Sequence, residues 1–110
     1  MDLKNINSNI FIGDQIEVFD IEIIAKKGIK TIICNRPDGE EEGQPTFAQI
    51  QTAAVKHKIA THYIPITSPF IAPEAITQMR AILENTDSPL LAYCRSGARS
   101  SHLYRLATNS

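Results

Sequence analysis

Residues 94–100 bring a thiol, two arginines, a glycine and two serines together in one short segment. This segment, here called the cysteine loop, reads Cys94-Arg95-Ser96-Gly97-Ala98-Arg99-Ser100 and directly follows the apolar run 90–93. Such a pattern is typical of a buried strand that ends in a tight loop and a helix N-terminus. Backbone N–H groups in that arrangement can converge on one small anion. The same positive field favours the thiolate, which is the nucleophilic form of cysteine.

Cys94 is therefore the candidate nucleophile, and the alternative is a buried structural cysteine at the end of a strand. Arg99 is expected to hold an oxyanion through two N–H groups. Ser100 either caps the last helix or donates its hydroxyl to the thiolate, since one side chain cannot do both well. Cys94, Arg99 and Ser100 form the candidate catalytic set.

The remaining residues of the cysteine loop form the candidate anion-binding set. Gly97 allows a backbone conformation that points successive N–H groups inward. The Arg95 side chain either contacts the anion as well or faces solvent and steers anionic substrates. The full set is Arg95, Ser96, Gly97 and Ala98.

Alternating apolar and amphipathic segments predict the elements that carry this loop, and the pattern is that of a parallel α/β sheet. We expect strands at 9–12, 30–34, 62–66 and 90–93. Helices are expected from 15–18 to 27, from 46, from 73 to 85 and from about 100 onward. Pro65 cannot donate to a strand ladder, so the third strand is predicted at a sheet edge, whereas 90–93 is apolar throughout and suits the centre.

Two helix starts and one helix face are specific enough to test. Thr46 and Gln49 have the spacing of a capping box, and Pro73 suits the first position of a helix. In the first helix, the apolar residues at helical spacing are expected to form the buried face; they are Ile16, Phe19, Ile23 and Ile24.

Loops that follow parallel strands gather at one edge of the sheet, where open α/β folds place their sites. The sequence therefore predicts that loops 35–45 and 67–72 meet the cysteine loop. Arg36, in the first of these, either contacts the bound anion or pairs with the acidic run 40–42. Cys34 is either a resolving thiol for Cys94 or, as its apolar surroundings favour, a structural residue.

Composition limits the possible functions. The chain has 110 residues, a formal net charge of −1 and two cysteines, so we expect a single domain over 1–110 and no disulfide framework. The charge gives no case for nucleic acid or an anionic membrane surface. The N-terminus lacks a secretory h-region, which makes the cytoplasm the expected location. No cysteine–histidine cluster has zinc spacing, and we expect neither a metal nor a cofactor.

Beyond these physical arguments, the cysteine loop resembles two known kinds of active-site loop. Cysteine-dependent phosphatases place five residues between cysteine and arginine, whereas four separate Cys94 from Arg99. The shorter spacing is similar to that of rhodaneses, which carry sulfur on cysteine as a persulfide. A shorter loop offers fewer amides and a tighter ring, which suits a tetrahedral phosphate less well.

The chain as a whole resembles the phosphatase-like domain of beta-lactamase-hydrolase-like proteins, from about Lys4 to Ala107. The segments that carry the resemblance are 31–40, with its Asn-Arg-Pro-Asp-Gly-Glu run, 43–45 and 91–97. The resemblance implies a three-layer α/β/α fold of the protein-tyrosine-phosphatase type, with four parallel strands in the order 1-4-2-3. Some family members carry the domain fused to a metallo-beta-lactamase-like module linked to sulfur oxidation. A separate partner of that kind is therefore expected here.

Phosphatases of this fold use a general acid, usually an aspartate in the loop after the third strand. Segment 67–72 contains no carboxylate, and Asp38 is either its substitute or an ordinary turn residue. The leading hypothesis is accordingly a sulfurtransferase that carries a persulfide on Cys94 and takes a small anionic sulfur donor. The alternatives are a protein-tyrosine or dual-specificity-type phosphatase, acting on a phosphoester through a phosphocysteine, and a non-catalytic module that binds anions or phosphoproteins.

Overall fold

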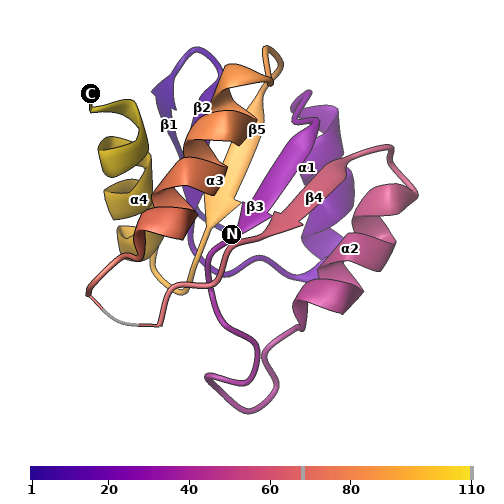
Figure 1. The fold of residues 1–110 in the computed structure, drawn as a ribbon. Helices are drawn as coiled ribbons and strands as arrows, with labels where there is room; N and C mark the ends of the chain where they lie inside the picture. Colours follow the sequence, from indigo (N-terminus) through magenta and orange to yellow (C-terminus); the bar gives the residue numbers. More distant parts are fainter. Residues whose placement is uncertain (68, 110) are drawn as a thin grey trace.

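The structure, a computed structural model, describes residues 1–67 and 69–109. One sheet runs through the middle of the molecule with helices on both faces (Figure 1). Within the described residues, no helix combines the length and the apolar character needed to cross a membrane. The elements in chain order are β1 (Leu3–Asn7), β2 (Ile10–Gly13), the 3-10 turn η1 (Val18–Asp20), α1 (Ile21–Lys26), β3 (Thr31–Cys34), α2 (Phe47–Val55), β4 (Ala60–Tyr63), α3 (Pro73–Glu84), β5 (Leu90–Tyr93) and α4 (Ala98–Thr108).

The sheet has the strand order β1-β2-β5-β3-β4. β2, β5, β3 and β4 run parallel to one another, and numbered in chain order they give 1-4-2-3, which confirms the predicted arrangement of the parallel strands. The prediction of four strands was wrong by one, because β1 pairs antiparallel with β2 and extends the sheet. The β1 sequence LKNIN is mostly exposed, so it lacks the apolar pattern that reveals a buried strand.

The parallel strands bury side chains on both faces, which accounts for their continuous apolar sequences. Along β5, Leu90 and Ala92 pack toward α3 and α4, while Leu91 and Tyr93 pack toward α1 and α2. The predicted three-layer α/β/α architecture is thereby confirmed, and β5 lies at its centre. The residue that follows β5 in the chain consequently emerges from the most enclosed part of the sheet.

The two predicted helix starts were confirmed, whereas the predicted buried face was only partly correct. Thr46 and Gln49 form the predicted reciprocal capping box, and Pro73 begins α3. The predicted buried face of the first helix was partly wrong, because Phe19 is 76% exposed and Ile23 is 48% exposed. The 3-10 turn η1 precedes α1 and changes the angular spacing, so that Ile21 joins the buried side instead.

β4 lies at the edge of the sheet, as predicted, but it spans Ala60–Tyr63 rather than 62–66, so Pro65, on which the prediction rested, follows the strand. The chain stays extended beyond it, and the N–H groups of Ile64 and Ile66 donate to the carbonyl oxygens of Cys34 and Asn35 at 2.9 Å each. This pairing carries the chain toward the loop edge of the sheet.

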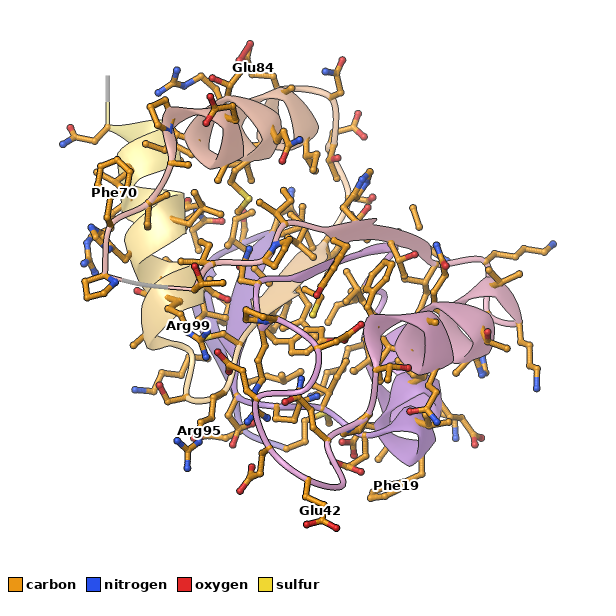
Figure 2. The ribbon with its side chains drawn as sticks, turned by 60° about the horizontal axis from the view of Figure 1, so that its bottom comes forward. Phe19, Glu42, Phe70, Glu84, Arg95 and Arg99 are labelled. Carbon is orange, nitrogen blue, oxygen red and sulfur yellow. The ribbon has the colours of Figure 1, made fainter. Side chains whose placement is uncertain are left out.

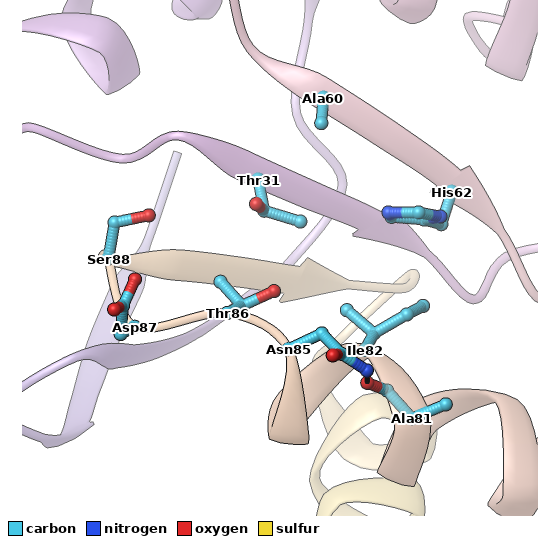
Figure 3. Close-up of a pocket in the computed structure, with 9 residues that line it drawn as sticks. All are labelled: Thr31, Ala60, His62, Ala81, Ile82, Asn85, Thr86, Asp87 and Ser88. Atoms are coloured by element: carbon cyan, nitrogen blue, oxygen red, sulfur yellow. Dashed lines mark hydrogen bonds between the residues drawn. The ribbon is translucent and has the colours of Figure 1, made fainter.

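The opposite end of the sheet is a separate region. A cavity of about 510 Å³ lies there, between the first residues of β3 and β4 and the end of α3 (Figure 3). Its lining includes Thr31, Ala60 and Asp87 and contains no residue of the cysteine loop. This cavity and the candidate site therefore lie at opposite ends of the sheet.

Shortening a central side chain tests this packing. Leu91 is fully buried in β5, so Leu91→Ala should lower the free energy of unfolding by about 2–5 kcal/mol, measured by urea titration. Val55→Ala is the control, because Val55 is 65% exposed and should cost less than about 0.5 kcal/mol. Equal losses in the two variants would contradict the described core.

Candidate active site

The cysteine loop joins the end of β5 to the start of α4. Gly97 precedes the helix with φ of +96°, a conformation that glycine adopts readily and other residues rarely do. A Cβ at this position would also lie 3.4 Å from the Ile12 methyl group Cγ2. The turn directs the Gly97 N–H toward Cys94, whose Sγ accepts it at 3.1 Å.

The surroundings of Cys94 favour the thiolate. The residue is fully buried, and burial by itself raises the pKa of a thiol. The N–H groups of Ser100, Gly97 and Arg99, with the Ser100 hydroxyl group close to the sulfur, outweigh that effect and hold the pKa of Cys94 below its ordinary value. A buried sulfur at a helix N-terminus, surrounded by N–H donors, is suited to nucleophilic chemistry.

Ser100 connects the cysteine loop to the loop after β3. Its buried hydroxyl donates to Asn35 Oδ1 at 2.8 Å, and Asn35 Nδ2 donates to the Ile64 carbonyl at 2.9 Å. Because the hydroxyl has one proton, its donation to Asn35 leaves the Ser100 N–H as the steadier donor to Cys94. The expectation that Ser100 caps the last helix was wrong, because α4 begins two residues earlier, at Ala98.

Arg99 brings the three predicted loops together. Its Nη1 donates to Glu40 Oε2 at 2.8 Å and to the Ile66 carbonyl at 2.8 Å, and its Nη2 donates to Glu40 Oε1 at 2.9 Å. Glu40 belongs to loop 35–45, and Ile66 directly precedes segment 67–72, so the predicted meeting of the loops is confirmed. Ser68, within that last segment, lies outside the described residues.

Glu40 is held in its charged form by two arginines. The hydrogen bonds from Arg99 are the largest cause. Burial opposes them, the hydrogen bond from Arg36 adds to them, and the net result lowers the pKa of Glu40 to about 2. A carboxyl with this pKa is ionised throughout the neutral range. Glu40 is therefore excluded as a proton donor to a leaving group.

Arg36 resolves one of the open alternatives, because it pairs with the acidic run. Its side chain is 3% exposed; Nε donates to Glu40 Oε1 at 3.0 Å and Nη2 donates to Glu41 Oε1 at 3.3 Å. Nη1 donates to Gln15 Oε1 at 3.1 Å, and the Gln15 N–H donates to the Arg95 carbonyl at 3.1 Å. Arg36 is thus part of the support beneath the loops.

The Arg95 side chain is exposed and makes no hydrogen bond within the described part of the chain. Figure 2 looks onto the loop edge and shows Arg95 projecting outward, while Arg99 lies closer to the ribbon. A pocket of about 390 Å³ opens between them, lined by Arg36, Glu40, Glu41, Arg95 and Arg99. The arrangement offers an anion two arginines, one fixed by its neighbours and one free to move.

The other loop residues show how tight the turn is. Ser96 and Ala98 are exposed, and the Ser96 hydroxyl accepts the Ala98 N–H at 3.4 Å. With Gly97 and Arg95 they place the predicted anion-binding backbone in one continuous segment that leads into the first residue of α4.

Asp38 and Cys34 both have structural contacts. Asp38 Oδ1 accepts the Phe47 N–H at the start of α2 at 2.9 Å, and the Asp38 N–H donates to the Tyr63 hydroxyl at 2.9 Å. The Cys34 thiol donates to the Arg36 carbonyl at 3.3 Å, and burial raises its pKa. These contacts favour the turn role for Asp38 and the structural role for Cys34.

Sequence reasoning missed Asn35 and treated Glu40 only as part of an acidic run. A signal existed for Asn35, since a polar residue directly after a fully apolar strand must find partners if it stays buried. No sequence signal indicated that Glu40 pairs with Arg99, because the two residues lie 59 positions apart in the chain.

Comparison with known proteins gives the relationship of this chain. The family model for the phosphatase-like domain of beta-lactamase hydrolase-like protein matches residues 2–110. A beta-lactamase hydrolase-like protein of Agrobacterium fabrum is 33% identical over 106 residues, which cover 96% of this chain and 25% of that protein. One from Xylella fastidiosa is 31% identical, over 97% of this chain and 25% of that protein. The chain thus spans about a quarter of these relatives.

Solved structures agree on the fold. A Neisseria meningitidis protein described as a candidate phosphatase superposes with a TM-score of 0.83 at 40% identity, over 91% of this chain and 71% of that one. TpbA of P. aeruginosa, solved in complex with pTyr, reaches a TM-score of 0.69 at 11% identity, over 94% of this chain and 62% of that one. The second likeness concerns the fold alone.

The predicted resemblance is confirmed along nearly the whole chain, with a fold of the protein-tyrosine-phosphatase type. Since the family model matches residues 2–110, this chain belongs to the family of phosphatase-like domains found in beta-lactamase hydrolase-like proteins.

Proposed function

We propose that this chain is a phosphomonoester hydrolase that uses Cys94 as its nucleophile. The observation that carries the proposal is the buried Cys94 sulfur, which lies at the start of α4 within reach of several N–H donors and of Arg99. Membership in a phosphatase-like family supports it, as does the likeness to the Neisseria meningitidis protein described as a candidate phosphatase.

The reaction has two steps. The Cys94 thiolate forms a bond to phosphorus while the bond from phosphorus to the ester oxygen breaks, giving a phosphocysteine and an alkoxide or phenoxide. Water then attacks phosphorus, and the sulfur leaves as thiolate. A proton from the attacking water passes to the alkoxide or phenoxide, so the products are an alcohol or phenol and inorganic phosphate. N–H groups of the cysteine loop and Arg99 stabilise the charge on the phosphoryl oxygens in both steps.

The lack of an evident acid narrows the substrate class. Segment 67–72 has no carboxylate, Glu40 is ionised, and Asp38 accepts a hydrogen bond at the start of α2. None of these three positions supplies a proton to the leaving oxygen. Phenolic esters, including phosphotyrosine, are suited to cleavage without a proton donor, because a phenoxide is far more stable than an alkoxide.

Sulfur transfer is the second candidate, and the four-residue spacing between Cys94 and Arg99 favours it. In this reaction the thiolate attacks the outer sulfur of a thiosulfate-like donor, and sulfite leaves with the bonding electrons. The persulfide on Cys94 then passes its sulfur to a thiol. No proton donor is needed, yet the relatives described as phosphatase-like support hydrolysis better.

One paired assay tests the two candidates. The purified chain is expected to release phosphate from 4-nitrophenyl phosphate, and Cys94→Ser should lower that rate by more than about 10³-fold. Cys34→Ala is the control and should keep the activity. Thiocyanate formed from thiosulfate and cyanide, lost in Cys94→Ser and without phosphate release, would overturn hydrolysis in favour of sulfur transfer. If neither product forms, a binding module remains.

The leaving group should control the hydrolysis rate. Without a positioned acid, kcat/KM for alkyl phosphates should fall below that for aryl phosphates by about 10²–10⁴-fold, the usual contribution of general acid catalysis. A series of substituted phenyl phosphates measures this as a steep dependence of rate on phenol pKa. A rate that does not depend on the phenol pKa would show that a proton donor acts on the leaving oxygen. A loss of activity in Asp38→Asn would then identify Asp38 as that donor.

The lowered pKa of Cys94 predicts a pH profile. Because only the thiolate reacts, alkylation of Cys94 by iodoacetamide should follow a titration curve whose midpoint lies below that of a free cysteine. Gly97→Ala strains the turn that aims an N–H group at the sulfur, so its midpoint should move to higher pH. Ser101→Ala, within α4, should leave the midpoint unchanged; mass spectrometry locates the label. An unshifted wild-type midpoint would contradict the described donors.

A further inference from the structure

We propose that Glu40 is a positioning residue, which turns Arg99 so that one edge of its guanidinium faces the anion bound above Cys94, and that buried Arg36 in turn holds Glu40. The inference rests on the proposed phosphatase activity, because it concerns the same anion site. Nothing in the chemistry of hydrolysis itself requires a carboxylate at this position.

The N–H groups of Arg99 show which part of the guanidinium is occupied. A guanidinium has five N–H groups, two on each Nη and one on Nε. Both groups on Nη1 are used, on Glu40 and the Ile66 carbonyl, and one on Nη2 is used on Glu40. The second Nη2 group and Nε lie on one edge, and within the described residues no oxygen accepts from them.

That unoccupied edge is the one that matters for the anion. Cys94 lies near Arg99 and is among the groups that raise the pKa of its guanidinium, after Glu40. Two parallel N–H groups on one guanidinium edge match two oxygens of a phosphoryl group. Glu40 accepts hydrogen bonds from both Nη atoms at the end of the guanidinium and leaves the edge formed by Nη2 and Nε free. It therefore orients Arg99 without occupying the anion position.

Arg36 explains why Glu40 can act in this way. Glu40 has a side chain that is 30% exposed, and an ion pair at such a site is by itself weak and mobile. Arg36 is only 3% exposed, and its charge has been removed from water, so it requires a partner. Its bond from Nε to Glu40 Oε1, at 3.0 Å, fixes the carboxylate from the protein interior.

The proposal predicts that the loss of Glu40 changes anion binding in the direction opposite to that expected from charge alone. Removing a negative charge beside an anion site should strengthen anion binding if charge alone matters. If Glu40 instead orients Arg99, its loss should weaken binding, because Arg99 no longer presents its free edge. The two effects oppose each other, so the direction of the change distinguishes them.

The experiment compares Glu40→Gln with Glu42→Gln in the full chain. Both variants remove one charge from the same loop, and Glu42 is exposed, with no ion pair or side-chain hydrogen bond in the described structure; Figure 2 shows it pointing outward. Glutamine at position 40 keeps the size but cannot accept from both Nη atoms of Arg99. Glu40→Asp serves as a second variant that restores the charge, and thermal unfolding verifies that each protein folds.

Two readouts are used. Protection of Cys94 from iodoacetamide by inorganic phosphate measures anion binding without turnover, and hydrolysis of 4-nitrophenyl phosphate gives kcat and KM. We expect Glu40→Gln to weaken phosphate protection several-fold and to lower kcat/KM by about 10- to 100-fold, with partial recovery in Glu40→Asp. Glu42→Gln should bind phosphate as well as the wild type or slightly better. In an Arg99→Ala background, Glu40→Gln should cause no further loss.

Several results would overturn the proposal. Phosphate binding that is unchanged or tighter in Glu40→Gln would show that Glu40 acts through charge alone. An equal loss in the Arg99→Ala background would show a general structural role. Phosphate protection without hydrolysis would reject the phosphatase function, while the binding measurements still decide the role of Glu40. Absence of any phosphate protection in the wild type would overturn the positioning role directly.

Discussion

The site depends on one constraint, which is that the Cys94 thiol is buried and burial opposes its ionised form. Cys94 follows the central strand β5 and is fully enclosed, so water cannot solvate its thiolate. The compensation comes from N–H groups at the start of α4, which the positive φ of Gly97 aims at the sulfur. Without that turn, burial alone would raise the pKa of Cys94 and leave an inert thiol.

The second layer of the site is a set of alternating charges. Arg36, Glu40 and Arg99 run from the interior to the pocket, and each is paired with the next. This arrangement gives Arg99 a fixed orientation that a lone surface arginine would lack. It also keeps Glu40 ionised, which fits the proposed preference for esters whose oxygen leaves easily.

Much of the fold followed from the chain pattern, because apolar runs and caps act over a few residues. The central position of β5, the edge position of β4, the capping box at Thr46 and the meeting of the loops were predicted in this way and confirmed. The full order of the parallel strands was an implication of the family resemblance, and it is confirmed as well. Strand β1 and the buried face of the first helix were not predicted correctly. β1 has few apolar residues, and the 3-10 turn ahead of α1 leaves Phe19 exposed. Both errors concern exposed segments, where hydrophobic periodicity carries little information.

The sequence by itself determined the reagent: a cysteine, a glycine turn and an arginine within six residues, after a strand that must be buried. These properties are local, so the chain order already contains them. Only the tertiary structure decided what surrounds the reagent. Arg99 meets Glu40 across 59 residues of chain, and Ser100 meets Asn35 across 65. Those contacts exist because parallel strands bring distant loops to one edge, and no short-range pattern specifies which side chains pair there.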